Sequence, residues 1–202
     1  MLKLNTHALI SRYSTLQWCL IAIVLFILSK VTQIFWLDPL YVKSQFPVNF
    51  FVGQTTFNAL QLKSYYAILV ELGTLNKYLI VQLADYVFML TVFISHLSLM
   101  IAAYKILPNI NLLKKITWAM IFISPMAAGF DALENIVSFF MIANPLNFSN
   151  WLVYPYSSFA SIKFIIFAIT YLWALLAIII KIIDIIYQVI HSFLNRKKIN
   201  VI

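Results

Sequence analysis

The stretch SPMAAGFDALENIVS, residues 124–138, places three polar side chains inside an apolar run of about residues 116–143. These side chains are Asp131, Glu134 and Asn135. The run is long enough to cross a bilayer, which takes about 20 residues of helix. A carboxylate at such depth costs about 2.5–3.5 kcal/mol on insertion scales, so buried acids normally have partners. We therefore expect the rest of the chain to supply charges that face this stretch.

The composition of the chain is that of a membrane protein. Of its 202 residues, 63% are hydrophobic and 10% are charged, whereas soluble domains carry about 25% charged residues. The net charge of +8 comes from basic residues at the ends of apolar runs, so we expect membrane lipids rather than nucleic acid as partners. The single cysteine, Cys19, excludes an internal disulfide and a Cys-based metal site. We expect no cofactor.

Four apolar runs predict an all-α fold, a four-helix transmembrane bundle that forms a single membrane domain over residues 1–202. The runs cover about residues 16–36, 78–104, 116–143 and 160–187. The pair Asp38-Pro39 is expected to end the first helix. Pro125, followed one turn later by Gly129, predicts a kink in the third helix.

The first connection is predicted to contain an amphipathic helix over about residues 56–72. Its apolar face is expected at residues with helical spacing, which are Leu60, Tyr65, Ile68, Leu69 and Leu72. We expect Gly73 to end this helix. The helix would lie on the membrane surface or over the mouth of the bundle, or it would be an ordinary packing helix in a loop.

Basic residues set the predicted orientation in the membrane. Most of them lie in the N-terminal segment, in the connection between the second and third runs and near the C-terminus: Lys3, Arg12, Lys105, Lys114, Lys115, Lys181, Arg196, Lys197 and Lys198. By the positive-inside rule, both termini face the cytoplasm and the other two connections face outward. We expect a protein of the bacterial inner (plasma) membrane.

Each predicted span carries an ionisable side chain towards the outer half of the membrane. Three spans place such side chains roughly 9–16 Å below the outer surface, at about 1.5 Å per residue, and the fourth places one near its outer end. Polar and small residues recur in helical stripes, which in a membrane bundle face away from lipid. The candidate binding or proton/cation cluster therefore consists of Asp85, Asp131, Glu134, Asn135, Lys30, Lys163 and Gln82.

Three hypotheses follow from this cluster, in which three acids face two bases. In the first, a non-enzymatic protein binds or moves a small molecule, a lipid or a proton, with Asp131 and Glu134 holding the proton or cation. In the second, a membrane-embedded enzyme acts on a lipid or sterol-like substrate by carboxylate acid/base chemistry. His96 counts against the enzyme, because it lies roughly 16 Å deeper than Asp85. In the third, the acids only hold the helices of a structural membrane subunit together.

Two strings carry a resemblance to a known family. YLIVQLADYVF, residues 78–88, and PMAAGFDALEN, residues 125–135, are joined by a basic connection. Together they resemble a family of small four-span integral membrane proteins with D-x-x-[FY] and D-x-x-E-N motifs, over about residues 57–142. The resemblance implies four spans and a site at Asp85, Asp131, Glu134 and Asn135, and it implies no activity. Where similar proteins have a Gly-Arg pair before the tyrosine, this chain has Thr74-Leu75.

Overall fold

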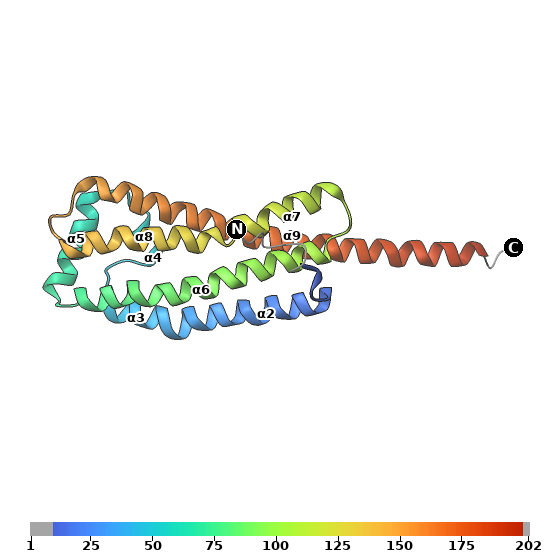
Figure 1. The fold of residues 1–202 in the computed structure, drawn as a ribbon, viewed down its shortest axis with the longest axis horizontal. Coiled ribbons are helices and arrows are strands. Elements are labelled where there is room, and N and C mark those ends of the chain that lie inside the picture. The colour runs from blue at the N-terminus through green and yellow to red at the C-terminus, as the bar shows by residue number, and fades with distance from the viewer. Residues whose placement is uncertain (1–9, 200–202) are drawn as a thin grey trace.

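The computed structural model describes residues 10–199, with side chains for residues 10–194. The described residues form helices and no strand, and four helical segments are long and apolar enough to cross a membrane: Thr15–Ser44, Leu75–Ile106, Asn111–Ala143 and Asn150–Leu194. These segments run side by side along one axis (Figure 1). The predicted all-α bundle of four transmembrane helices is confirmed. The predicted topology signals Lys3 and residues 196–198 lie outside the described side chains.

The first crossing continues past its predicted end. It consists of α2 (Thr15–Thr32), a π-helical turn (Gln33–Leu37) and α3 (Asp38–Ser44). The prediction that Asp38-Pro39 ends the helix is therefore wrong. In the π-helical turn, the N–H of Asp38 bonds to the carbonyl of Gln33, five residues back, and Pro39 falls in the first turn of α3. The π-helical turn lies directly before Pro39, where the missing N–H interrupts the regular helical hydrogen bonding, so the helix continues through a local irregularity instead of ending.

The central helix of the bundle is α6 (Leu75–Ile106), which packs against α2, α3, α7, α8 and α9. The third crossing is divided into α7 (Asn111–Ile123) and α8 (Met126–Ala143) by a turn at Ser124-Pro125, where the sequence predicts a kink. His96 of α6 stabilises this turn, since its Nδ1 lies 3.0 Å from the carbonyl oxygen of Ser124. Non-helical backbone at membrane depth needs such a partner within the protein.

The last crossing is α9 (Val153–Ile199), which follows a 3-10 turn at Asn150–Leu152. Its 47 residues make it about 70 Å long at 1.5 Å per residue. The helix therefore extends beyond the predicted span of about residues 160–187 at both ends. The C-terminal part of α9 extends past the other helices, at the end of the bundle where α2 begins (Figure 1).

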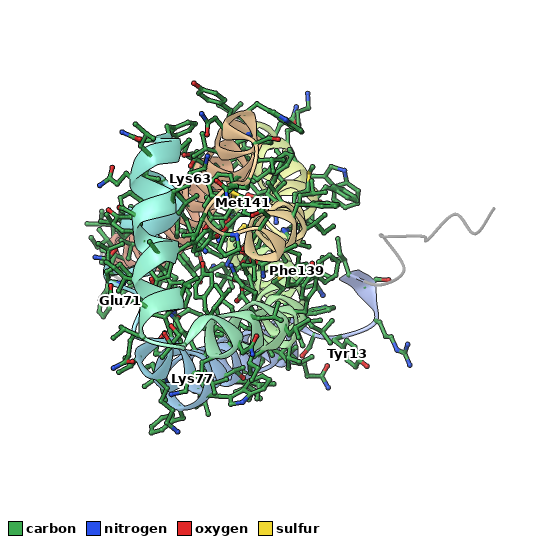
Figure 2. The ribbon with its side chains drawn as sticks, turned by 90° about the vertical axis from the view of Figure 1, so that its left-hand side faces the viewer. Tyr13, Lys63, Glu71, Lys77, Phe139 and Met141 are labelled. Carbon is green, nitrogen blue, oxygen red and sulfur yellow. The ribbon has the colours of Figure 1, made fainter. Side chains whose placement is uncertain are left out.

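The connection between the first two crossings covers the opposite end of the bundle. It contains α4 (Phe50–Gln54) and α5 (Ala59–Glu71). Figure 2 looks onto this end and shows α5 lying across it, with Lys63 and Glu71 at different heights along the helix. The Nζ of Lys63 donates a hydrogen bond to Oδ1 of Asn150, 2.6 Å away, which ties α5 to the start of the last crossing. Among the positions predicted for this helix, α5 takes the one over the end of the bundle.

The ends of α5 follow from its sequence, but its buried face does so only in part. The side chain of Asn58 caps the first turn, and Gly73, with φ of +65°, ends the helix as predicted. Of the predicted apolar face, Tyr65 and Leu69 are buried against the bundle, whereas Leu60, Ile68 and Leu72 are exposed. The buried side chains are Leu62, Tyr65, Tyr66 and Leu69. They turn towards aromatic side chains of distant segments, a contact that local periodicity does not reveal: Tyr41, Phe46, Tyr78 and Phe148.

Candidate functional site

Six of the seven predicted site residues form one buried cluster between α6, α8 and α9. The residues are Gln82, Asp85, Asp131, Glu134, Asn135 and Lys163, and each is at most 4% exposed. Helical spacing explains how two of these helices present several polar groups at once, since residues three or four apart share a face. The cluster lies in the part of the bundle nearest to α5, because Tyr66 of α5 interacts electrostatically with Glu134.

Lys163 holds two acids of the cluster. Its Nζ lies 2.5 Å from Oδ1 of Asp131 and 2.5 Å from Oε2 of Glu134. Asp131 and Glu134 stand three residues apart on α8, so both reach the one ammonium group of α9. All three side chains are 4% exposed or less. We call this group the closed triad.

Asp85 has a weaker partner. The amide of Asn135 donates to Oδ2 of Asp85 at 3.0 Å and to the backbone carbonyl of Gln82 at 3.2 Å. The side-chain amide of Gln82 in turn donates to Oγ of Ser138 at 2.7 Å. Among the described residues, no cationic group lies within ion-pair distance of Asp85. This carboxylate is 4% exposed, and it therefore lies buried without a countercharge in direct contact.

A cavity of about 170 Å³ lies beside Asp85. Its charged lining residues are Lys30, Asp38, Asp85, Asp131 and Lys163. Glutamines and aromatic rings complete the wall, among them Gln33, Gln54, Phe88, Phe164 and Tyr171. Concave sites that combine apolar walls with a few placed polar groups are where proteins bind small ligands. We call this space the polar cavity.

Lys30, the seventh predicted residue, lines the polar cavity but does not join the ion pairs. Its Nζ donates a hydrogen bond to Oε1 of Gln33, 3.2 Å away. It also lies 5.8 Å from the ring centroids of both Phe26 and Tyr171. No carboxylate of the described residues lies within ion-pair distance of Lys30, so Lys30 makes no direct ion pair with the acids of the cluster. The reason is that α2, which carries Lys30, packs mainly against α6. In contrast, α9, which carries Lys163, packs against α8, where Asp131 and Glu134 lie.

The structure adds two residues that the sequence does not predict as part of the site. Asp38 lines the polar cavity because the first crossing continues through the π-helical turn. Gln54 of α4 also lines it; the residue is 4% exposed, and its side chain makes no hydrogen bond with a described residue. Asp38 lies eight residues after Lys30, whereas residues on one face of an α-helix recur about every seven. The π-helical turn between them contains one extra residue, so the two side chains fall on the same face. The sequence gives only a weak signal of this. We find no sequence signal for Gln54.

Three tyrosines that do not line the polar cavity lie close to Glu134. The phenols of Tyr66, Tyr78 and Tyr156 all interact electrostatically with its carboxylate. Burial raises the pKa of the Tyr66 phenol above its ordinary value, so this group is neutral at physiological pH. The tyrosines separate the closed triad from the end of the bundle that α5 covers.

His96 does not contribute to the polar cavity. Because the Ser124 carbonyl can only accept, the Nδ1 of His96 carries the proton, and Nε2, 3.2 Å from the hydroxyl of Tyr171, accepts. Neither nitrogen contacts a described carboxylate. The arrangement that the enzyme hypothesis requires, a histidine beside an acid in one cavity, is not present among the described residues.

The described residues contain no group of three or more His, Cys, Asp or Glu side chains that could hold a metal ion. Comparison of the chain with protein-family models, with curated proteins and with solved structures finds no match. The geometry of the closed triad and the polar cavity therefore carries the functional argument.

Proposed function

We propose that this chain is a non-enzymatic, multi-pass protein of the bacterial inner membrane that binds a small ammonium-bearing molecule in the polar cavity. One observation carries the proposal: the buried carboxylate of Asp85 faces a cavity and has no cationic partner among the described residues. Intramembrane acids that face a cavity commonly mark a ligand or ion pathway.

The charges around the polar cavity support a cationic ligand. Three carboxylates line the polar cavity, those of Asp38, Asp85 and Asp131, and a fourth, that of Glu134, pairs with Lys163; the basic groups are the ammonium groups of Lys30 and Lys163. If all six groups are ionised, two negative charges remain. A buried charge without a partner is costly, and a bound ammonium group supplies the partner that the protein lacks.

The geometry divides the roles of the acids differently from the first sequence hypothesis. Asp131 and Glu134 already share Lys163, which favours a structural role for them of the kind in the third hypothesis. Asp85, with Asp38 and Gln54 across the polar cavity, takes the ligand-binding role. In this proposal, Asp131 and Glu134 have the structural role, and the neighbouring Asp85 has the binding role.

Basic side chains near the end of the bundle opposite α5 support cytoplasmic termini. The Nζ of Lys105 donates to the backbone carbonyl of Tyr13 at 2.5 Å, and the Nζ of Lys114 donates to the backbone carbonyl of Tyr104. These lysines therefore lie where the first crossing begins. The positive-inside rule assigns such an end to the cytoplasm, so the end covered by α5 would face outward.

Native mass spectrometry of protein extracted from its own membranes tests the proposal. We expect the wild type to retain an amine-containing molecule that Asp85→Asn loses. Asp184→Asn is the matched control, because Asp184 pairs with Lys181 on α9 away from the polar cavity, and it should keep the ligand. Equal ligand occupancy in the wild type and Asp85→Asn would contradict the proposal. So would a wild type that carries no ligand and binds neither added ethanolamine nor phosphoethanolamine.

A further inference from the structure

Resting on this proposed function, we infer that the ligand is a phospholipid with an ethanolamine-type head group. The head group occupies the polar cavity, and a hydrocarbon chain occupies a neighbouring apolar groove. The groove lies between α2, α6 and α9 and has a volume of about 410 Å³.

The two spaces differ in size and in lining. The polar cavity, at about 170 Å³, is smaller than the sites of drug-sized ligands, which span about 300–1,000 Å³. It holds a small polar group only. The groove falls within that range and is lined by apolar side chains of the three helices. Small residues on each helix, among them Ala22, Ala103 and Ala174, keep it open.

The polar cavity and the groove meet at Tyr171, beside Lys30. Tyr171 lines both spaces. Phe26 lines the groove, and the Nζ of Lys30 lies 5.8 Å from the ring centroids of both aromatic residues. From the groove into the polar cavity, the wall is therefore first apolar, then positive at Lys30, then negative at Asp85 and Asp38.

This order of charges matches one class of amphiphile. In a phosphoethanolamine lipid, the hydrocarbon is followed by a negative phosphate and then by a positive ammonium group. Lys30 has no ion-pair partner among the described residues, so its ammonium group is available to a phosphate. The carboxylate of Asp85 is likewise available to the ligand's ammonium group.

The acceptors in the polar cavity favour ethanolamine over other head groups. A primary ammonium group has three N–H donors, which suit the carboxylates and the unpartnered amide oxygen of Gln54. Choline has no N–H to donate. A glycerol head group lacks the positive charge, so its lipid would bring a net negative charge towards the acids, which disfavours binding.

Cys19 is a natural reporter on the groove, so no cysteine has to be introduced. It is the only cysteine of the chain, it is partly buried and it lines the groove. The full chain, purified in detergent, is alkylated with N-ethylmaleimide, and the rate is followed by intact-protein mass spectrometry. The probes are lysophosphatidylethanolamine, lysophosphatidylglycerol and lysophosphatidylcholine of equal chain length. We expect the ethanolamine lipid to slow alkylation at least tenfold and the other two to slow it far less.

Two variants show whether the protection comes from this site. Asp85→Asn keeps Cys19 and should remove the difference between the lipids. In the double variant Cys19→Ser, Leu172→Cys, the thiol lies on α9 at a position that is 58% exposed in the wild type and outside the groove. This thiol should react at the same rate with every lipid. Equal protection of both thiol positions would show only a detergent effect and overturn the inference.

The remaining outcomes separate the inference from the proposed function. Equal protection of Cys19 by all three lipids overturns the head-group assignment. Suppose instead that phosphoethanolamine raises the melting temperature of the wild type but not of Asp85→Asn, while no lysolipid protects Cys19. The polar cavity then binds an amine, but the groove does not bind its chain, and the inference fails while the proposed function stands. Loss of both effects overturns both.

Discussion

Lys163 and Lys30 lie in two neighbouring regions of the bundle, the closed triad and the polar cavity, that differ sharply. In the closed triad, Lys163 is 3% exposed and touches two carboxylates at 2.5 Å. In the polar cavity, Lys30 is partly buried and has a neutral glutamine and two aromatic rings as neighbours. Both are lysines in apolar spans. The comparison teaches that the partners assembled by the fold, rather than the residue type, decide which charge is structural and which is free to meet a ligand.

The largest expected effect is that of Lys163→Met. Removing this ammonium group leaves Asp131 and Glu134 buried without a countercharge, which costs about 3–5 kcal/mol of unfolding free energy. Unfolding in mixed micelles with increasing denaturing detergent, followed by circular dichroism, measures this loss. Lys181→Met is the matched control, because Lys181 pairs with one acid at 3.0 Å and is 37% exposed. It should lose no more than about 1 kcal/mol.

A suppressor sharpens this result. Adding Asp131→Asn and Glu134→Gln to Lys163→Met neutralises the stranded acids and should restore most of the lost stability. If Lys163→Met instead unfolds like Lys181→Met, the closed triad does not hold the helices together and the contrast between the two regions collapses.

A smaller effect is expected in the hydrogen-bond network beside Asp85. Ser138 accepts the hydrogen bond from the side-chain amide of Gln82, whose backbone carbonyl accepts from Asn135. Ser138→Ala removes that acceptor from a buried amide, for an expected loss of about 1–3 kcal/mol in the same unfolding assay. Ser192→Ala, at an exposed position of α9, should change stability by less than about 0.5 kcal/mol. Equal effects of the two substitutions would show that the network through Gln82 adds nothing to stability.

The smallest stability effect is expected for Lys30→Gln. Lys30 has no ion-pair partner among the described residues, so its loss should change the unfolding free energy by less than about 1 kcal/mol. The same preparation should show at least tenfold weaker protection of Cys19 by lysophosphatidylethanolamine. A loss of stability as large as that of Lys163→Met would make Lys30 structural and erase the difference between the regions.

The sequence predicts some elements of this molecule well and others badly. The stripe of Gln82 and Asp85 on α6 and the stripe of Asp131 and Asn135 on α8 are buried, as their spacing predicts. Such stripes are reliable because lipid excludes polar groups from the outside of a bundle. The face of α5 is predicted only in part, because this helix lies over the bundle end, where an exposed leucine such as Leu60 costs little.

The sequence by itself determined that four helices cross the membrane, that the third breaks at Pro125 and that polar side chains converge between the helices. Composition and periodicity suffice for this, since the span length follows from the bilayer and the inward face from the exclusion of polar groups from lipid. Only the tertiary structure decided that Lys163 closes on Asp131 and Glu134, and that Asp38 and Gln54 join Asp85 around the polar cavity. Periodicity orients a side chain about its own helix axis, whereas pairing depends on the depth and rotation of one helix against another. Packing between distant segments sets that depth and rotation.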